Sequence, residues 1–409
     1  MKKNPIHDFT SKLIQSEVIE NLKNYVRWQQ DLRKSSEPST LFEKVPDHAP
    51  ISINLDLTTA CNYACDHCVD IDILNTGIRF EYEKLEKSID QMAKKGLKSV
   101  IIIGGGEPTV DPKFTTIVPF LKKRNIQVAI VSNGSRMDRL LDVSHYLDEN
   151  DWIRLSLDSG RNETFQAMHK PKGKGITLEE ICSGVAPIRK KNSKLKMGFS
   201  FIVTWKGATN KDINIVENIN EIQEAAQLAR DSDFTYFSIK PFLIRSETNN
   251  AEIVGIDEYT KNYFDVIKQI RISIGKIKKL ETSTFSVIES TNLSALESGD
   301  YKKFTNQPKN CHFTFFRQVL SPLGVYNCPV YRHVGIAKLS ENDGYSTQDS
   351  YQETNNNVGK HIYEFDASEN CKNVTCLYNS TNWFIEDLIS NPNKLENLMP
   401  IEDEMDFYL

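Results

Sequence analysis

The stretch "LTTACNYACDHCVD" (residues 57–70) places three cysteines, Cys61, Cys65 and Cys68, within eight positions in the pattern C-x3-C-x2-C. No fourth cysteine lies nearby, because the next one is Cys182. Structural zinc sites and closed iron–sulfur clusters normally take four protein ligands. Three thiolates can instead hold three irons of a [4Fe–4S] cube and leave the fourth iron open to a chelating ligand such as an α-amino acid. The spacing therefore favours a cluster with one open corner.

The bulk composition is typical of a soluble globular protein. The chain has 409 residues, enough for two or three domains, with 39% hydrophobic and 26% charged residues. A net charge of −5 argues against a protein held on nucleic acid by phosphate contacts. The N-terminus lacks the apolar segment of a signal peptide, and no apolar run approaches the roughly 20 residues that span a bilayer. We therefore expect a cytoplasmic protein without a membrane partner.

Strand and helix patterns alternate from residue 51 to residue 240, which predicts a parallel sheet covered by helices. Six strands are expected, at 51–57, 98–103, 126–132, 152–157, 196–203 and 234–240. Helices are expected between them, at 82–96, 112–125, 135–150, 178–191 and 210–231. Six units are too few to close an eight-stranded barrel, so the predicted fold class is α/β, a partial (β/α)6 TIM-type barrel. Because ligands gather at the carboxyl ends of parallel strands, the cysteines after the first strand lie at the expected mouth.

Outside this region the pattern is less regular, and four segments are predicted. They are an N-terminal helical extension (1–50), the barrel (51–245), a helical linker (246–305) and a C-terminal cysteine-containing domain (306–409). Helices are expected at 8–35, 257–279 and 379–389. The stretches 290–310 and 340–359 are polar and are expected to be loops, the second exposed and mobile, and the acidic tail is expected to be solvated.

Three further motifs follow predicted strands. "GGGEP" (104–108) follows the second strand, where glycines allow a ligand to approach the backbone and Glu107 can accept hydrogen bonds from an amine. "SNGS" (132–135) follows the third strand and "SLDSG" (156–160) ends the fourth. Taken singly, such residues are commonly turn or cap residues. Together with the cysteines, they form four motifs in a fixed order along one barrel.

This combination resembles the radical SAM enzymes over residues 51–242. The resemblance implies that S-adenosylmethionine (SAM) binds the open iron and is cleaved reductively to a 5′-deoxyadenosyl radical, which abstracts a substrate hydrogen. It also implies contacts of Gly105, Gly106 and Glu107 with the methionyl group, and of four polar residues with the ribose: Ser132, Asn133, Ser156 and Asp158. The position before the third cysteine is often aromatic in the family, whereas this chain has His67. A zinc site completed by His67 is the alternative, although His67 directly adjoins Cys68.

A second group of four cysteines lies near the C-terminus: Cys311, Cys328, Cys371 and Cys376. Its layout resembles the twitch domain, a shortened SPASM domain that follows many radical SAM barrels, and implies one auxiliary [4Fe–4S] cluster. A four-cysteine zinc site or reduced buried thiols are the alternatives. The sequence "CPVYRH" places Tyr331, Arg332 and His333 after one ligand, where they face either substrate or the surroundings of the cluster. Cys182 belongs to neither group and is expected to pack as a small hydrophobe.

The function implied by the resemblance is that of a radical SAM enzyme of oxidoreductase type, acting on a small sugar-like molecule. A maturase that modifies a ribosomal peptide or a protein is the alternative. It is disfavoured at this point because the segment before the barrel is short for a peptide-recognition domain. A non-catalytic iron–sulfur or zinc scaffold is the third possibility, and a ligand cradle around Glu107 argues against it. A reductase such as flavodoxin or ferredoxin is the expected partner, and the sequence assigns no catalytic residue.

Overall fold

A twisted, mostly parallel sheet forms the centre of the protein. The computed structural model describes residues 8–173, 175–256, 261–402 and 404–409. Six parallel strands neighbour one another in the order β8-β5-β4-β3-β2-β1. They are β1 (Ser52–Leu55), β2 (Ser99–Ile102), β3 (Gln127–Ser132), β4 (Trp152–Ser156), β5 (Lys196–Val203) and β8 (Tyr236–Pro241). The six predicted strands and the open α/β barrel are thus confirmed.

The sheet continues beyond both edges of this six-stranded unit. At one edge, β11 (Ser286–Glu289) pairs parallel to β8. At the other, β12 (Arg317–Ser321) pairs parallel to β1, and β13 (Gly324–Tyr326) and β14 (Lys338–Ser340) follow in antiparallel order. The hairpin between Cys311 and Cys328 is therefore a continuation of the barrel sheet. This pairing brings the second cysteine group next to the first strand.

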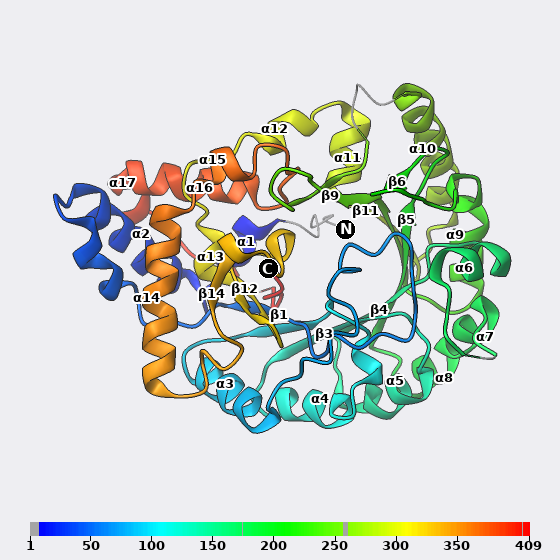
Figure 1. Cartoon of the computed structure of the whole chain (residues 1–409), viewed down its shortest axis with the longest axis horizontal. Helices are drawn as coiled ribbons and strands as arrows, with labels where there is room; N and C mark the ends of the chain where they lie inside the picture. Colours follow the sequence, from blue (N-terminus) through cyan, green and yellow to red (C-terminus); the bar gives the residue numbers. More distant parts are fainter. Residues whose placement is uncertain (1–7, 174, 257–260, 403) are drawn as a thin grey trace.

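Seven helices form the outer arc around the strands (Figure 1). Each presents an apolar face to the sheet; the first, for example, buries Leu85, Ile89 and Met92. The helix predicted over 178–191 is divided by Gly184 into two short ones. The seven are α3 (Tyr82–Lys94), α4 (Phe114–Lys122), α5 (Met137–Val143), α6 (Asn162–His169), α7 (Leu178–Ser183), α8 (Val185–Lys191) and α9 (Ile222–Asp231).

The long helix predicted over 210–231 was wrong in its first half. Residues 209–214 form a small hairpin of β6 (Thr209–Asn210) and β7 (Ile213–Asn214), and α9 begins only at Ile222. The buried side chain of Asn218 explains the interruption, because its amide donates to the carbonyls of Asp158 and Ile202. A side chain that bonds backbone groups in this way competes with helix formation.

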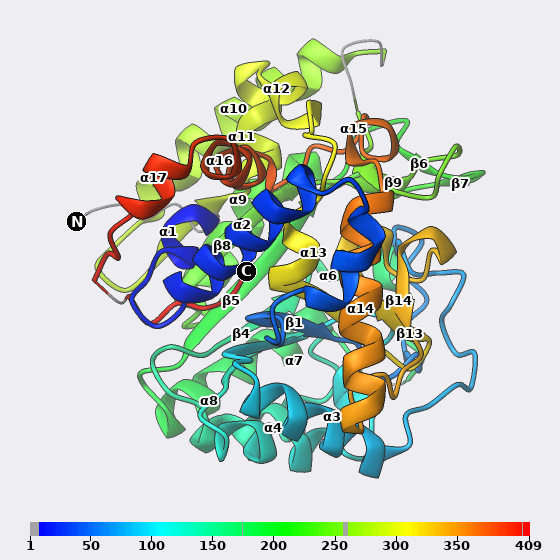
Figure 2. The same cartoon turned by 90° about the vertical axis from the view of Figure 1, so that its left-hand side faces the viewer.

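Two segments predicted as loops contain helices. Residues 290–310 include α11 (Thr291–Ser298), capped by Ser290, and α12 (Tyr301–Thr305). The stretch 340–359, expected to be mobile, contributes most of α14 (Gln348–Glu364). A capping box at Thr347 starts α14, and its few apolar residues are buried. Figure 2 shows α14 running beside the β13–β14 edge of the sheet. Polar composition alone misled the prediction, since one narrow apolar stripe suffices for a packed helix.

The N-terminal helices pack against the C-terminal part of the chain. The helix predicted over 8–35 is broken into α1 (Phe9–Leu13) and α2 (Ile19–Lys34). The second lies against α16 (Asn379–Ser390), which confirms the helix expected there. Of the helix predicted over 257–279, α10 (Tyr263–Ile277) is observed, and residues 257–260 lie outside the described residues. In the described residues no helix has the length and apolarity needed to cross a membrane.

The C-terminal tail is not solvated as expected, because residues 407–409 are buried at the amino-terminal ends of the strands. The hydroxyl of Ser99 donates to the carbonyl of Phe407 at 2.7 Å, and the amide N–H of Phe407 donates to Gln127. The ring of Tyr408 packs edge-on against Trp152. The tail therefore closes the base of the barrel, opposite the mouth where the cysteines lie.

Candidate functional site

One cavity of about 1040 Å³ connects the two cysteine groups. Cys61, Cys65 and Cys68 line it on the side of the long loop after β1, and Cys328 and Cys376 line it on the C-terminal side. In Figure 1 the loop after β1 lies inside the arc of strands. Every sequence-predicted contact residue also lines this cavity: Gly105, Gly106, Glu107, Ser132, Asn133, Ser156 and Asp158. The structure thus gathers the predicted motifs around a single space.

Without a metal, the surroundings of the three cysteines in the first group disfavour the thiolate form. Burial raises the pKa of Cys61, and burial together with the neighbouring thiolates raises the pKa of Cys65 well above its usual range. The pKa of Cys68 is raised to about 12, again mainly by burial. Metal coordination removes this penalty, because a bound cation stabilises the deprotonated sulfur. Three half-buried free thiols facing one cavity therefore fit the open-cornered cluster that their spacing suggested.

The glycine loop after β2 packs directly against the start of the cysteine loop. A Cβ added to Gly106 would lie 2.7 Å from the carbonyl carbons of Thr59 and Ala60, closer than real Cβ atoms approach such atoms. The N–H of Glu107 donates to the carbonyl of Ala60 at 2.8 Å, directly before Cys61. Glycine at position 106 is therefore what allows the two loops to touch.

Glu107 is buried and ties the glycine loop to the loop after β3. One carboxylate oxygen accepts hydrogen bonds from the N–H of Thr109 at 2.9 Å and the hydroxyl of Ser132 at 2.8 Å. The other accepts the N–H of Asn133 at 2.6 Å. Burial raises the pKa of Glu107, and these hydrogen bonds oppose the rise. Because carboxylate oxygens can accept more than one hydrogen bond, Glu107 keeps capacity for an amine in the cavity.

The loop after β3 is also joined to the cysteine loop. The side-chain amide of Asn133 donates to Asn62 at 3.0 Å, and Asn62 donates to the hydroxyl of Ser135 at 2.9 Å. Asn62 directly follows Cys61, so this pair fixes the cysteine loop relative to the barrel. Ser156, at the end of β4, lines the cavity without a contact of this kind.

Asp158 holds two imidazoles beside Cys65. Its carboxylate lies 3.4 Å from a ring nitrogen of His67 and 3.4 Å from one of His169. Burial alone would raise the pKa of Asp158, but the contacts with His169 and His67 outweigh burial and hold this pKa well below its usual range. The other nitrogen of His169 lies 3.3 Å from the sulfur of Cys65. His169 is buried at the end of α6.

The histidines bear on the zinc alternative. Ligand atoms of Cys65, His67 and His169 all lie within 4.8 Å of one another. Zinc commonly binds such donors, but both imidazoles already face the carboxylate of Asp158, and this set leaves Cys61 and Cys68 outside it. An iron–sulfur cube uses all three cysteines and leaves the histidines around it. The donor geometry therefore favours the cluster.

The four cysteines of the second group lie close together, although 42 residues of chain separate Cys328 from Cys371. Burial raises the pKa of Cys371 and Cys376 well above the usual range, and Cys311 and Cys328 raise both further. Four mutually close buried thiols suit a metal with four sulfur ligands. Cys182, by contrast, is buried in α7 and packs in the hydrophobic core, away from both groups.

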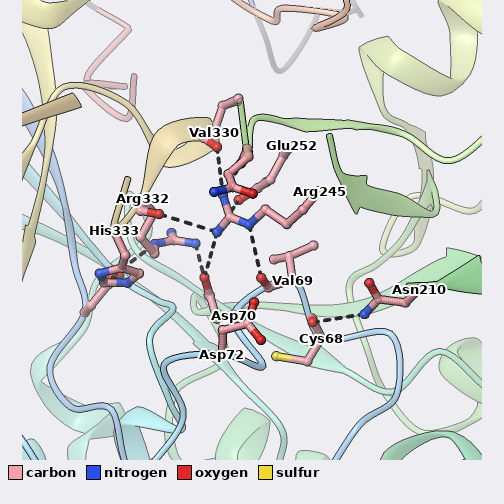
Figure 3. Close-up of polar contacts among 12 residues, drawn as sticks. Cys68, Val69, Asp70, Asp72, Asn210, Arg245, Glu252, Val330, Arg332 and His333 are labelled. Carbon is pink, nitrogen blue, oxygen red and sulfur yellow. Dashed lines mark hydrogen bonds and ion pairs between the residues drawn. The ribbon is translucent and has the colours of Figure 1, made fainter. Parts of the chain in front are cut away.

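Arg332 lies close to Asp70, as Figure 3 shows, and both residues line the cavity. Its guanidinium lies 3.0 Å from the carboxylate of Asp56, at the end of β1, and 3.3 Å from that of Asp70, two residues after Cys68. His333 also lies 3.4 Å from Asp56. Arg332 thereby connects the loop after Cys328 to the loop after Cys68. Arg332 also lines the cavity, so both possibilities for its role stay predictions.

Arg245 reinforces the same connection from β9 (Leu243–Arg245). It donates to the carbonyls of Val69 at 3.2 Å and Val330 at 3.0 Å, and it pairs with Asp70 at 3.2 Å (Figure 3). Glu252 lies 3.7 Å from Arg245 and lines the cavity, and burial raises the pKa of Glu252 to about 7. Sequence reasoning missed Asp56, Asp70, Arg245 and Glu252, because no periodicity or motif marks isolated charged residues that meet only in three dimensions.

The radical SAM superfamily profile matches residues 55–219, which include the cysteine loop and the strands up to β5. The chain is 28% identical over 195 residues to the mycofactocin maturase MftC of Mycolicibacterium smegmatis. That match covers 46% of this chain and 43% of the maturase, so it spans less than half of that relative. The chain is also 24% identical over 305 residues to the S-adenosylmethionine-dependent nucleotide dehydratase of Flammeovirga pacifica, covering 72% of this chain and 91% of the dehydratase.

Solved structures share the fold at low sequence identity. Streptococcus suis SuiB bound to the precursor peptide SuiA superposes with a TM-score of 0.52 at 13% identity, covering 76% of this chain and 67% of SuiB. SuiB bound to S-adenosylmethionine gives a TM-score of 0.56 at 12% identity, covering 91% of this chain and 83% of SuiB. The partial barrel with its C-terminal extension is therefore a known arrangement.

Proposed function

We propose that this chain, whose residues 55–219 match the radical SAM superfamily, carries a SPASM/twitch-like extension and is a maturase that modifies a peptide. Its cofactors are S-adenosylmethionine and [4Fe–4S] clusters, an auxiliary cluster included. Held by Cys61, Cys65 and Cys68, a [4Fe–4S] cluster with bound SAM would supply radical chemistry that removes a hydrogen atom from the substrate. The remaining steps are carried by residues that bind, orient and shield the substrate.

The residues around the cavity divide into three roles. Cys61, Cys65 and Cys68 are proposed to hold the SAM-binding cluster, and the four C-terminal cysteines the auxiliary cluster. Glu107 is proposed to accept the methionyl amine, because its buried carboxylate lines the cavity beside the cysteine loop. The polar residues at the ends of β3 and β4 are proposed to contact the ribose: Ser132, Asn133, Ser156 and Asp158.

The cavity that reaches both cysteine groups is the observation that carries this proposal. A substrate seated there lies between a site that removes a hydrogen atom and a site that can accept the second electron. Net removal of one hydrogen atom, one electron and one proton lowers the substrate mass by two units. Arg332 and Arg245 keep the two loops at a fixed separation. An external reductase, of the flavodoxin or ferredoxin class, is proposed to supply the initiating electron.

A peptide is favoured over a sugar-like molecule for two reasons. Among the relatives, the maturase has a higher identity than the dehydratase, 28% against 24%. The SuiA-bound SuiB fold further supports a barrel of this shape as one that accepts a peptide. The expected preference for a small sugar-like molecule rested on the short segment before the barrel, and that segment instead packs on α16.

A nucleotide is the second candidate substrate. The alignment with the nucleotide dehydratase covers 91% of that relative and extends over 72% of this chain, beyond the barrel. Under this alternative the reaction is loss of water from a nucleotide, and the product mass falls by about 18 units instead of two. The two candidates are therefore separable by product mass.

Co-expression tests the proposed function directly. The protein is produced with each short open reading frame that neighbours its gene, and the peptides are examined by mass spectrometry. We expect one peptide to lose two mass units, and to remain unmodified beside the Cys61→Ala variant. In parallel, the purified enzyme is incubated anaerobically with SAM, dithionite and a panel of nucleoside triphosphates. A dehydrated nucleotide together with unmodified peptides would replace the maturase proposal with the second candidate.

Replacing Cys328 with alanine is expected to separate SAM cleavage from product formation. Cys328 lines the cavity on the auxiliary side, so its loss leaves the first cysteine group complete. We expect 5′-deoxyadenosine to form without a matching amount of modified substrate. The measurement is the ratio of the two products by liquid chromatography and mass spectrometry. Coupled turnover at the wild-type ratio would show that the auxiliary site is dispensable.

A further inference from the structure

The inner wall of the barrel carries an ordered polar patch on three neighbouring strands. Ser156, Ser200 and Ser238 occupy one row, because they pair in register across β4, β5 and β8. Arg154 precedes its serine by two residues on β4, and Lys240 follows its serine by two residues on β8. Since side chains alternate along a strand, all five lie on the same face of the sheet. Arg154 thus lies on the amino-terminal side of the serine row, and Lys240 lies on its carboxyl-terminal side.

Both cations lack an anionic partner. Among the residues that the structure describes, the side chains of Arg154 and Lys240 make no hydrogen bond or ion pair, and the Nε of Arg154 is buried without any acceptor. The guanidinium lies over the ring face of Trp152, at 5.2 Å from the centroid. The hydroxyl of Ser200 is likewise buried and unsatisfied. Unpaired buried donors of this kind are rare and costly in folded proteins.

The patch faces the same cavity as the cysteines. Arg154, Ser156, Ser238 and Lys240 all line it. Burial and, to a lesser extent, the nearby charge of Arg154 lower the pKa of Lys240 to about 7. The nearest carboxylate, Asp158, partly opposes this effect but is already committed to two histidines. The wall therefore gathers two cationic side chains and hydroxyl donors, and no carboxylate of the described residues forms an ion pair with either cation.

We infer that this wall is an anion-binding subsite for the substrate, formed by Arg154 and Lys240 with Ser200 and Ser238 between them. Its ligand is an oxyanion, which accepts charge-assisted hydrogen bonds from the guanidinium and the ammonium. Under the proposed function, on which this assignment of the ligand rests, the oxyanion is a carboxylate of the peptide. A phosphate offers the same oxygen acceptors, and the test below distinguishes the two sources.

The subsite would fix the register of the substrate in the cavity. An anionic group held on the β4–β8 wall leaves the neighbouring part of the substrate near the carboxyl ends of the strands, where the cysteine loop lies. A maturase must select one residue of a flexible peptide, and a buried bidentate anchor gives such selectivity because a substrate lacking the anion leaves these donors unpaired.

Binding to the reconstituted holoenzyme tests the inference without any substrate turnover. Isothermal titration calorimetry is performed in the presence of saturating SAM, with glutarate as the carboxylate probe and tripolyphosphate as the phosphate probe. The variants are Arg154→Met, Lys240→Met and their combination. Lys196→Met is the matched control, because Lys196 lines the same cavity at the amino-terminal end of β5 but stands outside the patch. Arg154→Lys tests whether charge alone suffices.

At least one probe is expected to bind, with affinity lowered about 10-fold by each single variant and about 100-fold by the double variant. Lys196→Met should bind as the wild type does, and Arg154→Lys should recover part of the loss. Tighter binding of glutarate supports a peptide carboxylate, whereas tighter binding of tripolyphosphate supports a phosphate-bearing substrate. Either result supports the subsite.

Two results would overturn the subsite. One is that neither probe binds, or that the double variant binds as tightly as the wild type. The other is that the double variant loses SAM affinity, measured by equilibrium dialysis, because the cations would then serve the cofactor. Retained cluster absorbance in each variant shows that the protein is folded. The binding assay contains no peptide. Its result therefore tests the subsite even if the maturase proposal is wrong.

Discussion

Replacing Cys61 with alanine is expected to abolish formation of 5′-deoxyadenosine from SAM. Three cysteines ligate three irons of a cube and leave the fourth iron open. Cys61 directly follows Ala60, whose backbone Gly106 and Glu107 contact. Without this thiolate the cluster loses a ligand in a site where burial already disfavours thiolates. The measurement is 5′-deoxyadenosine after anaerobic incubation with SAM and dithionite, together with the iron content of the reconstituted protein.

Cys182→Ala is the matched control for this result. Cys182 is buried in α7, belongs to neither cysteine group and packs with apolar neighbours. Its replacement removes one sulfur atom from the core and should cost about 1 kcal/mol in the free energy of unfolding. SAM cleavage should then remain at the wild-type level. Cleavage at the wild-type rate by Cys61→Ala would instead show that the first cysteine group does not hold the SAM-binding cluster.

The barrel was predictable from sequence because its signals are local and repeated. Each of the barrel strands β1 to β5 is a short apolar run followed by an amphipathic segment, β8 is the sixth such run, and this alternation has few interpretations in a chain of this length. The cysteine triplet and "GGGEP" could also be recognised from the sequence, because their chemistry depends on residue spacing within a few positions. Their meeting in one cavity follows from a rule of parallel sheets, that loops after neighbouring strands share one edge.

The features that were missed depend on distant contacts. Arg332 lies 276 positions after Asp56, and no local pattern announces their ion pair. The acidic sequence of the tail does not predict the burial of Tyr408 and Leu409. Their burial depends on the space at the base of the barrel, which the tail fills. The prediction of a loop at α14 failed for a different reason. The many polar residues of this segment obscured a narrow apolar stripe of Tyr351, Val358 and Ile362.

A second large effect is expected from Gly106→Ala, a change of one methyl group. The added Cβ would be forced against the backbone of Thr59 and Ala60, and a backbone segment cannot rotate away as a side chain can. We expect a loss of about 3 kcal/mol in the free energy of unfolding, or a displaced cysteine loop in a protein that still folds. In either case iron incorporation at the first site and formation of 5′-deoxyadenosine should fall to background.

Gly275→Ala separates this packing effect from a general effect of replacing glycine. Gly275 lies within α10, and an added Cβ would meet no atom within 4 Å. Alanine is the better helix former by about 1 kcal/mol, so this variant should be slightly more stable and fully active. Thermal unfolding and 5′-deoxyadenosine formation are measured on both variants. If Gly106→Ala incorporated iron and cleaved SAM as Gly275→Ala does, the contact between the glycine loop and the cysteine loop would not determine the geometry of the cluster site.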